Sequence, residues 1–263
     1  NLRQLSLLIG LIGHTASGLR QENSMLADSE VQRALVVTAH PDDVDFGAGA
    51  TVASWREQGI EVTYCVITDG DAGGFDPTVP RSQIPSIRRA EQTAAAAACG
   101  VTDVRFLGYR DGELTVSHDL RRDISRVIRQ VRPQRVVIQS PERNWERIYS
   151  SHPDHLAAGE AAIQAVYPDA RNPFAHPTLL QDEGLEDWAV PEVWVMAAKD
   201  PNHFVDVTDF FDAKIAALRA HESQTGHLDD LVERIDGWLT MNAKAAGLAQ
   251  GRLAEAFMVV STA

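Results

Sequence analysis

Short apolar runs rich in β-branched residues alternate with segments of helical periodicity over the first half of the chain. Apolar runs bounded by polar or glycine-containing loops predict buried strands, and apolar residues three and four positions apart predict helices. The strands are expected around 35–37, 61–68, 103–107 and 134–139, and the helices at 47–59, 85–100 and 119–131. This alternation indicates an α/β fold with a Rossmann-like, mostly parallel sheet and helices on both faces.

The last third of the chain is less regular. Residues 168–191 are rich in proline and acidic residues and predict a long surface loop near the rim of a cleft. Further strands are expected at 192–197, 202–208 and 254–261, and helices at 156–166, 209–222 and 228–249. Neither an internal repeat nor a Gly/Ser-rich linker interrupts the pattern, so residues 31–263 predict a single domain.

Residues 1–30 form an N-terminal extension that we set apart from the fold. The apolar run at 5–13 is too short to span a bilayer and resembles the core of a signal peptide, yet no small-residue cleavage pattern follows it cleanly. An upstream extension and an interface segment are equally compatible with this run. We therefore expect no transmembrane span and, by default, a cytoplasmic protein.

The charge balance limits the classes of partner. The chain carries a formal net charge of -13, whereas binding to nucleic acids and anionic membranes requires a basic surface. A neutral small molecule such as a sugar is compatible with this charge. Cys65 and Cys99 stand in apolar surroundings, which is typical of small buried hydrophobes rather than of a disulfide or a metal-binding pair. The composition leaves a homo-oligomer open.

A polar cluster, His40 to Asp43, directly follows the first predicted strand. Ligands bind at the carboxyl ends of the strands in open α/β sheets. An imidazole beside two carboxylates can hold a metal with one carboxylate while the other acts as a base. The alternative is structural, with an aspartate that caps the next helix and a histidine that satisfies the end of the strand. A second cluster downstream favours the functional interpretation.

This second cluster, His-Pro-Asp-His at 152–155, follows the fourth predicted strand and precedes a helix. Both clusters leave the same edge of the sheet, so we expect them to converge on one site. Two histidines and one carboxylate are a common catalytic zinc set with an open position for water. His40, Asp43 and His155 are the natural members of that set.

The remaining polar residues suit metal-assisted hydrolysis of an amide. Asp42 lies next to a ligand and can take a proton from an attacking water. His152 can act as a general acid or hydrogen-bond the developing oxyanion, and Asp154 can orient one of the histidines. Arg88 lies near the amino end of a predicted helix, where a basic residue opposes the helix dipole, and it can reach into the cleft.

These motifs resemble those of the LmbE-like or PIG-L family of zinc-dependent N-deacetylases. The matching segments are AHPDD at 39–43 with the glycines that follow, RRAE at 88–91 ahead of an alanine-rich helix, LGYRDG at 107–112, HPDH at 152–155 and KIAALRAHESQ at 214–224. The resemblance covers about residues 33–260. It implies the same α/β fold with the metal site at the carboxyl ends of the strands.

The resemblance implies removal of an acetyl or other short acyl group from the amino nitrogen of an N-acetylglucosamine-type sugar or sugar conjugate. It implies zinc held by His40, Asp43 and His155, with Asp42 as the base and His152 as the acid or oxyanion partner. Another divalent metal such as Fe²⁺ also suits a set of nitrogen and oxygen ligands.

The resemblance further implies contacts to the substrate, which we expect from Arg88, Asp111 and His221. Two alternatives stay open. The same centre can serve an amidase that acts on a non-sugar natural product or a thiol conjugate. The chain can also be a nucleotide-binding α/β module with a structural metal, although the incomplete glycine pattern at 47–49 and the base left free beside the metal argue against this.

Overall fold

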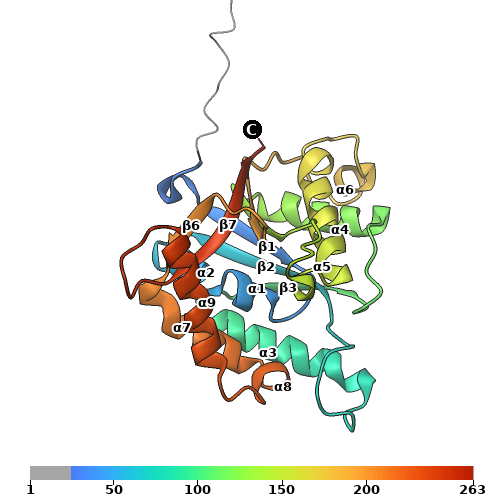
Figure 1. The fold of residues 1–263 in the computed structure, drawn as a ribbon. Coiled ribbons are helices and arrows are strands. Elements are labelled where there is room, and N and C mark those ends of the chain that lie inside the picture. The colour runs from blue at the N-terminus through green and yellow to red at the C-terminus, as the bar shows by residue number, and fades with distance from the viewer. Residues whose placement is uncertain (1–24, 263) are drawn as a thin grey trace, which may run out of the picture.

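The computed structural model describes residues 25–262. Strands of this part form one sheet in the order β3-β2-β1-β4-β5-β7-β6 (Figure 1). The strands from β3 to β5 in that order run parallel, whereas β7 is antiparallel to both of its neighbours. Their bounds are β1 Arg33–Thr38, β2 Glu61–Thr68, β3 Asp103–Tyr109, β4 Arg135–Gln139, β5 Glu192–Met196, β6 His203–Asp206 and β7 Ala254–Ser261. The predicted α/β, mostly parallel sheet is confirmed.

Helices cover both faces of the sheet (Figure 1). Helices α4 and α5 pack on one face and α2, α3 and α7 on the other, where α9 joins α7 in a further apolar cluster. Their bounds are α1 Asp43–Gly47, α2 Gly49–Glu57, α3 Ile84–Ala98, α4 His118–Val131, α5 Pro153–Gln164, α6 Pro177–Gln181, α7 Phe211–Ala220, α8 Glu222–Thr225 and α9 Leu231–Ala245. Short 3-10 turns are η1 Asp28–Glu30, η2 Arg81–Gln83, η3 Ile148–Ser150 and η5 Thr208–Phe210, and η4 Ala165–Asp169 is a π turn after α5.

The central strand β1 shows why the sheet has a helical layer on each face. Leu35 and Val37 belong to the apolar cluster with α4 and α5, whereas Val36 belongs to the cluster with α2, α3 and α7. These three side chains are at most 1% exposed. Because a strand buried on both faces needs apolar residues at every position, its sequence is a continuous apolar run.

The order of the strands determines where a ligand can bind. From β1 the chain moves outward through β2 and β3 and then returns to β4 on the other side of β1. The direction of winding therefore reverses between β1 and β4, and open α/β sheets bind ligands in the crevice at such a point. The segment after β1 carries His40, and the segment after β4 leads into α5.

Several predicted boundaries differ from the structure. The helix expected at 47–59 is two helices, because the backbone leaves the helical conformation at Ala48 (φ -145°, ψ 8°) between α1 and α2. His155 lies inside α5 rather than ahead of a helix. The segment 168–191, expected to be a surface loop, contains α6 and the buried ring of His176.

The packed part of the chain begins earlier than residue 31. The Leu26 N–H donates to Glu192 Oε2 at 2.7 Å, and Asp28 pairs with Arg135 at 2.7 Å. The residues from 26 onward therefore belong to the fold, whereas the apolar run at 5–13 lies outside the described residues. None of the helices between residues 25 and 262 combines the length and the hydrophobicity that a membrane span requires.

Gly159 allows α5 to approach β4, because a Cβ atom at this position would overlap the Gln139 carbonyl oxygen. We predict that Gly159→Ala lowers the free energy of unfolding by about 1–3 kcal/mol, the usual cost of overpacking. Urea unfolding measures this change. Gly237→Ala in α9 is the matched control, since its added Cβ meets none of the described atoms within 4 Å and should stabilise the helix by about 1 kcal/mol or less. A Gly159→Ala protein as stable as the wild type would contradict the close packing.

Candidate active site

The segment after β1 is a short, stiff turn. His40 lies two residues beyond the strand, Pro41 has a restricted φ, and Asp43 begins α1. Between them Asp42 has a left-handed backbone conformation (φ 93°, ψ -27°), which is uncommon for a residue other than glycine. The His40 N–H donates to Asp43 Oδ2 at 2.6 Å. This turn brings one imidazole and two carboxylates to the crevice between β1 and β4.

Helix α5 supplies the second histidine from the other side of the crevice. His155 Nε2 lies 3.2 Å from His40 Nδ1 and 3.0 Å from Asp43 Oδ1. Asp43 Oδ2 lies 3.4 Å from His40 Nδ1. The three predicted metal ligands are therefore in mutual contact, although His40 and His155 are 115 positions apart in the sequence.

These three side chains can hold a divalent metal ion. Ligand atoms of a tetrahedral zinc centre with bonds of 2.0–2.1 Å lie about 3.3 Å apart. The two histidine nitrogens are 3.2 Å apart, and each lies 3.0 or 3.4 Å from one of the two Asp43 oxygens. The side chains of His40 and Asp43 are each 10% exposed, and that of His155 is 22% exposed. The set is therefore largely buried but reachable from solvent on the side of His155.

The second nitrogen of His40 faces two more carboxylates. Nε2 lies 3.0 Å from Asp111 Oδ1 and 3.1 Å from Asp154 Oδ2. Burial opposes the charged imidazole, but hydrogen bonds to Asp111, Asp154 and Asp43 outweigh it and raise the pKa of His40 to about 12. The three carboxylates thus favour a positive charge on or beside the His40 ring. A divalent ion on the Nδ1 side meets the same demand while Nε2–H still donates to the carboxylates.

Asp154 is held from behind by the backbone. Its side chain is fully buried, Oδ2 accepts the Gly112 N–H at 2.7 Å, and Oδ1 accepts the Leu114 N–H at 3.2 Å. Burial raises the pKa of Asp154, but the bonds from His40 and from these two N–H groups lower it below its ordinary value. Asp154 therefore stays ionised and fixes the orientation of the His40 ring.

Asp42 is bound to an arginine rather than to the histidines. Its Oδ2 accepts a hydrogen bond from Arg88 Nη2 at 2.9 Å. Burial raises the pKa of Asp42 to about 6, and the charge of Arg88 opposes that shift. A carboxyl group with a pKa close to neutral pH is well suited to accept a proton and to release it again.

His152 caps the amino end of α5 and lies beside the ligand set. Its Nδ1 accepts the Asp154 N–H at 3.2 Å, so the neutral ring carries its proton on Nε2. Burial lowers the pKa of His152, and the charges of His40 and His155 lower it further. The rings of His152 and His40 meet edge to face with centroids 4.9 Å apart. Because nitrogens of the three histidines lie within 4.8 Å of one another, His152 can act as a donor or as a further ligand.

Comparison with known proteins identifies the family. The sequence profile of PIG-L, described as GlcNAc-PI de-N-acetylase, matches residues 35–166. The chain is 34% identical over 196 residues to diacetylchitobiose deacetylase of Thermococcus kodakarensis, which covers 74% of this chain and 71% of that protein. The chain belongs to the PIG-L family.

Two further PIG-L comparisons agree with this. The chain is 34% identical over 198 residues to a probable N-acetyl-alpha-D-glucosaminyl L-malate deacetylase 2 of Bacillus cereus, covering 73% of this chain and 83% of that protein. Among solved structures, N,N'-diacetylchitobiose deacetylase from Pyrococcus horikoshii aligns with a TM-score of 0.79 at 29% identity, covering 88% of this chain and 85% of the other. The resemblance inferred from the sequence motifs is confirmed.

Two of the residues expected to contact the substrate are engaged by protein groups. The His221 ring is fully buried, and its Nε2 lies 2.8 Å from Asp45 Oδ2. Asp111 is 8% exposed and has both oxygens engaged, one by His40 and the other by the Ala72 N–H at 3.2 Å. Both side chains support the site from behind in this structure, and a contact of either one with a substrate stays a prediction.

Arg88 reaches the site, as predicted, but it is covered by protein. Its side chain is 4% exposed, Nη2 also bonds the Pro41 carbonyl oxygen, and Nη1 bonds the Gly70 carbonyl oxygen at 3.2 Å. A Cβ atom at Gly70 would collide with the guanidinium, so the glycine allows the loop to close over Arg88. A direct contact between Arg88 and a sugar stays a prediction.

The sequence motifs missed two buried residues of this site. Gln92 Oε1 accepts the Asp42 N–H at 2.7 Å, and Gln92 Nε2 donates to Asp45 Oδ2 at 2.9 Å. Both side chains are fully buried. The spacing carried a signal for Gln92, because it lies one helical turn after Arg88 and so projects from the same face of α3.

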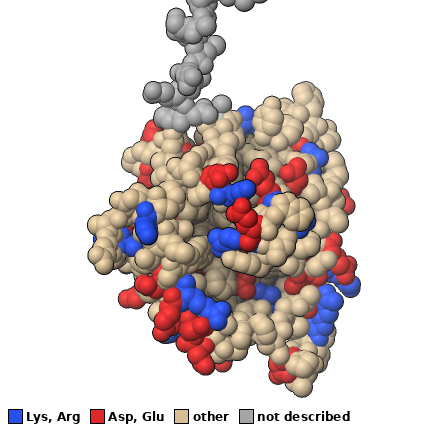
Figure 2. Space-filling model, in the orientation of Figure 1, with Lys and Arg blue, Asp and Glu red and all other residues tan. Residues whose placement is uncertain are grey.

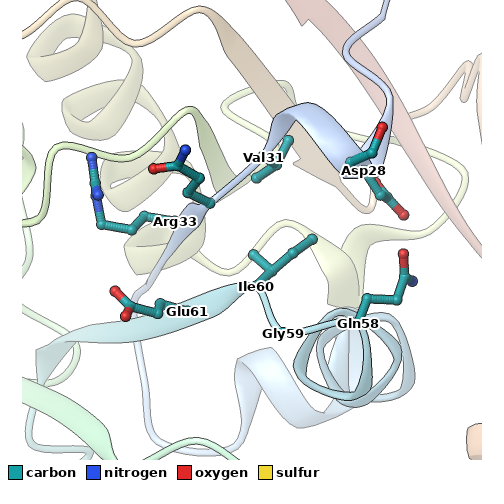
Figure 3. Close-up of a pocket in the computed structure, with 9 residues that line it drawn as sticks. Asp28, Val31, Arg33, Gln58, Gly59, Ile60 and Glu61 are labelled. Atoms are coloured by element: carbon teal, nitrogen blue, oxygen red, sulfur yellow. The ribbon is translucent and has the colours of Figure 1, made fainter.

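The cluster at His40 is distinct from the hollow of about 610 Å³ in Figure 3. That hollow lies at the amino ends of β1 and β2, beside Val31 and Ile60, and none of its lining residues is a predicted site residue. His40 follows the carboxyl end of β1, so the hollow and the His40 cluster lie at opposite ends of the strands. On the face in Figure 2, acidic and basic side chains are interspersed rather than gathered into a continuous basic surface.

We predict that Asp154→Asn weakens the binding of a divalent metal by about 10- to 100-fold, the usual effect of losing a carboxylate behind a ligating histidine. The neutral amide no longer supplies negative charge to His40 Nε2. Competition with a chromogenic chelator measures the affinity. Glu113→Gln is the control, because its side chain is 60% exposed in the neighbouring loop. Equal affinities in wild type and Asp154→Asn would contradict the orienting role.

Proposed function

We propose that this PIG-L protein is a zinc-dependent hydrolase that removes an acetyl or other short acyl group from the amino nitrogen of an N-acetylglucosamine-type sugar or sugar conjugate. The observation that carries the proposal is the mutual contact of His40, Asp43 and His155 with Asp42 beside them. The relatives named above act on diacetylchitobiose or are named for an N-acetylglucosaminyl malate. Their shared unit is the acylated glucosamine, which we assign to this crevice.

In this mechanism Asp42 moves the proton. His40, Asp43 and His155 would hold a divalent metal, which would supply Lewis acidity to the reaction. Asp42 accepts a proton from the water while the water oxygen forms a bond to the carbonyl carbon. When the carbon–nitrogen bond breaks, the same proton passes to the amine, so the products are a carboxylic acid and a free amino sugar.

His152 assists at the carbonyl oxygen in the same proposal. Because its Nδ1 accepts the Asp154 N–H, its Nε2–H is the donor that remains for a ligand. Negative charge develops on the carbonyl oxygen during attack, and a fixed donor in a partly dehydrated site stabilises that charge. Burial and the charges of His40 and His155 lower the pKa of His152, which favours the neutral ring that donates a hydrogen bond.

We assign zinc as the metal because two imidazoles and one carboxylate are a common catalytic zinc set. Fe²⁺ fits the same donors, since such a set does not select a metal by affinity alone. We assign the choice of acceptor group to the segments 70–84, 140–150 and 168–191. The second of these segments carries Trp145, which is 80% exposed and offers an aromatic face to a sugar ring or its acceptor.

Replacing the base should separate chemistry from metal binding. We predict that Asp42→Asn retains about one metal per chain, because the amide leaves the three ligands in place, and loses roughly 10²- to 10⁴-fold in kcat. Metal analysis and acetate release from N-acetylglucosamine derivatives measure the two effects. Asp200→Asn, at an exposed position, is the matched control. Turnover by Asp42→Asn at the wild-type rate would refute the role of Asp42.

A panel of acylated substrates distinguishes a sugar deacetylase from an amidase of other amides. We expect amine release from N-acetylglucosamine, N,N'-diacetylchitobiose and N-acetylglucosaminyl conjugates, and far slower release from N-acetyl amino acids and N-acetylcysteamine. The reason is that the proposal assigns binding energy to the sugar ring next to the amide. Fluorescamine detection of primary amines follows each reaction. Faster release from the non-sugar amides would favour the amidase.

A further inference from the structure

Asp42 needs support to keep its conformation. Its backbone angles, φ 93° and ψ -27°, lie in a region that residues other than glycine rarely adopt. Such a conformation persists only when the surrounding structure holds it. The proposed function places the base at this residue. The groups that hold the Asp42 backbone therefore influence where its carboxylate lies.

Helix α3 holds both polar groups of a single peptide unit, the one between Pro41 and Asp42. Arg88 Nη2 donates to the Pro41 carbonyl oxygen, and Gln92 Oε1 accepts the Asp42 N–H at 2.7 Å. Arg88 and Gln92 are four residues apart, so they project from the same face of the helix. Neither the oxygen nor the N–H of this peptide unit is left free to turn.

Gln92 is itself fixed by two further buried residues. Its Nε2 donates to Asp45 Oδ2 at 2.9 Å, which determines which end of the amide faces Asp42. The same Asp45 oxygen lies 2.8 Å from His221 Nε2, at the junction of α7 and α8. Gln92, Asp45 and His221 are all fully buried. A series of hydrogen bonds therefore connects the Asp42 backbone to His221, far along the sequence.

The junction of α7 and α8 is also fastened to α3. Glu91, next to Gln92, accepts hydrogen bonds from the Ser223 N–H and hydroxyl, each at 2.7 Å. His221 is thus held in place relative to the helix that carries Gln92. Burying so many polar groups is costly unless they are bonded to one another, and an apolar cluster would fill the same space. The polar cluster ends at the N–H of Asp42, the residue with the left-handed backbone.

We propose that Gln92, Asp45 and His221 form a positioning relay that fixes the Pro41–Asp42 peptide unit and so aims the Asp42 carboxylate. This inference rests on the proposed function, in which Asp42 is the base. The three are positioning residues, since none touches the substrate. The relay also gives the buried His221 a role: it acts through Asp45 and Gln92 instead of contacting the sugar.

The test compares variants that break the relay with one that preserves it. Gln92→Met fills a similar volume without an acceptor for the Asp42 N–H, and Asp45→Ala removes the oxygen that holds Gln92 and His221. Asp45→Asn keeps one oxygen that can accept from both donors. Gln134→Met is the matched control, because Gln134 Oε1 likewise accepts a backbone N–H, that of Arg33 at 2.8 Å, at the opposite edge of the sheet.

Gln92→Met and Asp45→Ala should lower kcat by about 10- to 100-fold, since a small misplacement of a reacting group has effects of this size. KM and the metal content should stay close to wild type, and Asp45→Asn should recover most of the lost kcat. Gln134→Met should turn over at the wild-type rate. Wild-type kcat in a folded Gln92→Met protein, or equal loss in Asp45→Ala and Asp45→Asn, would overturn the relay. If Asp45→Ala does not fold, Gln92→Met carries the same test.

Amide hydrogen exchange at Asp42, followed by NMR, tests the relay without turnover. Exchange should accelerate in Gln92→Met, because the N–H loses its acceptor, and stay slow in Asp45→Asn and Gln134→Met. Unchanged exchange in Gln92→Met would overturn the relay. If the wild-type protein releases no amine from any acylated sugar, the proposed function fails on its own, and the exchange rates still decide whether the relay holds Asp42.

Discussion

Three carboxylates surround the His40 ring, and the positive charge needed to balance them is the constraint on which the rest of the site depends. The carboxylates of Asp43, Asp111 and Asp154 all approach this one imidazole. Charges buried together in this way are costly unless a cation and good hydrogen bonds compensate them. In the protein alone the proton of His40 supplies that charge, as its raised pKa indicates. A metal ion on the opposite nitrogen answers the same need, which is why this cluster suits one.

The site is assembled from both faces of the sheet. Helix α5, on one face, supplies Asp154 and His155, whereas α3, on the other face, holds Asp42 through Arg88. The reversal of winding between β1 and β4 lets these two helices meet at the turn that carries His40. The candidate base is therefore held by a different helix from the one that carries His155, although His40 and Asp43 share the turn of Asp42.

The local sequence pattern was sufficient to predict much of the fold and the contact between the candidate metal ligands. The runs at 61–68 and 254–261 coincide with β2 and β7, because apolar residues bounded by polar ones define a buried strand. The two His-Pro-Asp clusters predicted the contact between His40 and His155, because the carboxyl ends of parallel strands share one edge. Their spacing in the sequence is irrelevant once the topology is known.

The back of the site could not be predicted from local pattern. The partners of Asp111 and His221 come from distant segments, and burial of a polar side chain depends on packing that the sequence does not display. His221 lies in a motif of the family, and this suggested a contact with substrate, whereas its ring faces Asp45 in the interior. Gln92 stands in an alanine-rich helix with no motif of its own. Its role depends on the left-handed turn at Asp42, whose N–H it accepts.

Titration of the metal-free enzyme with zinc, followed by acetate release from N,N'-diacetylchitobiose, tests whether the cluster at His40 is a catalytic zinc centre. We predict no measurable release after treatment with a chelator and a linear recovery that ends at one zinc per chain, since His40 Nδ1, Asp43 and His155 would together hold one ion. Full activity in the metal-free enzyme, or recovery that continues to two zinc ions per chain, would contradict it.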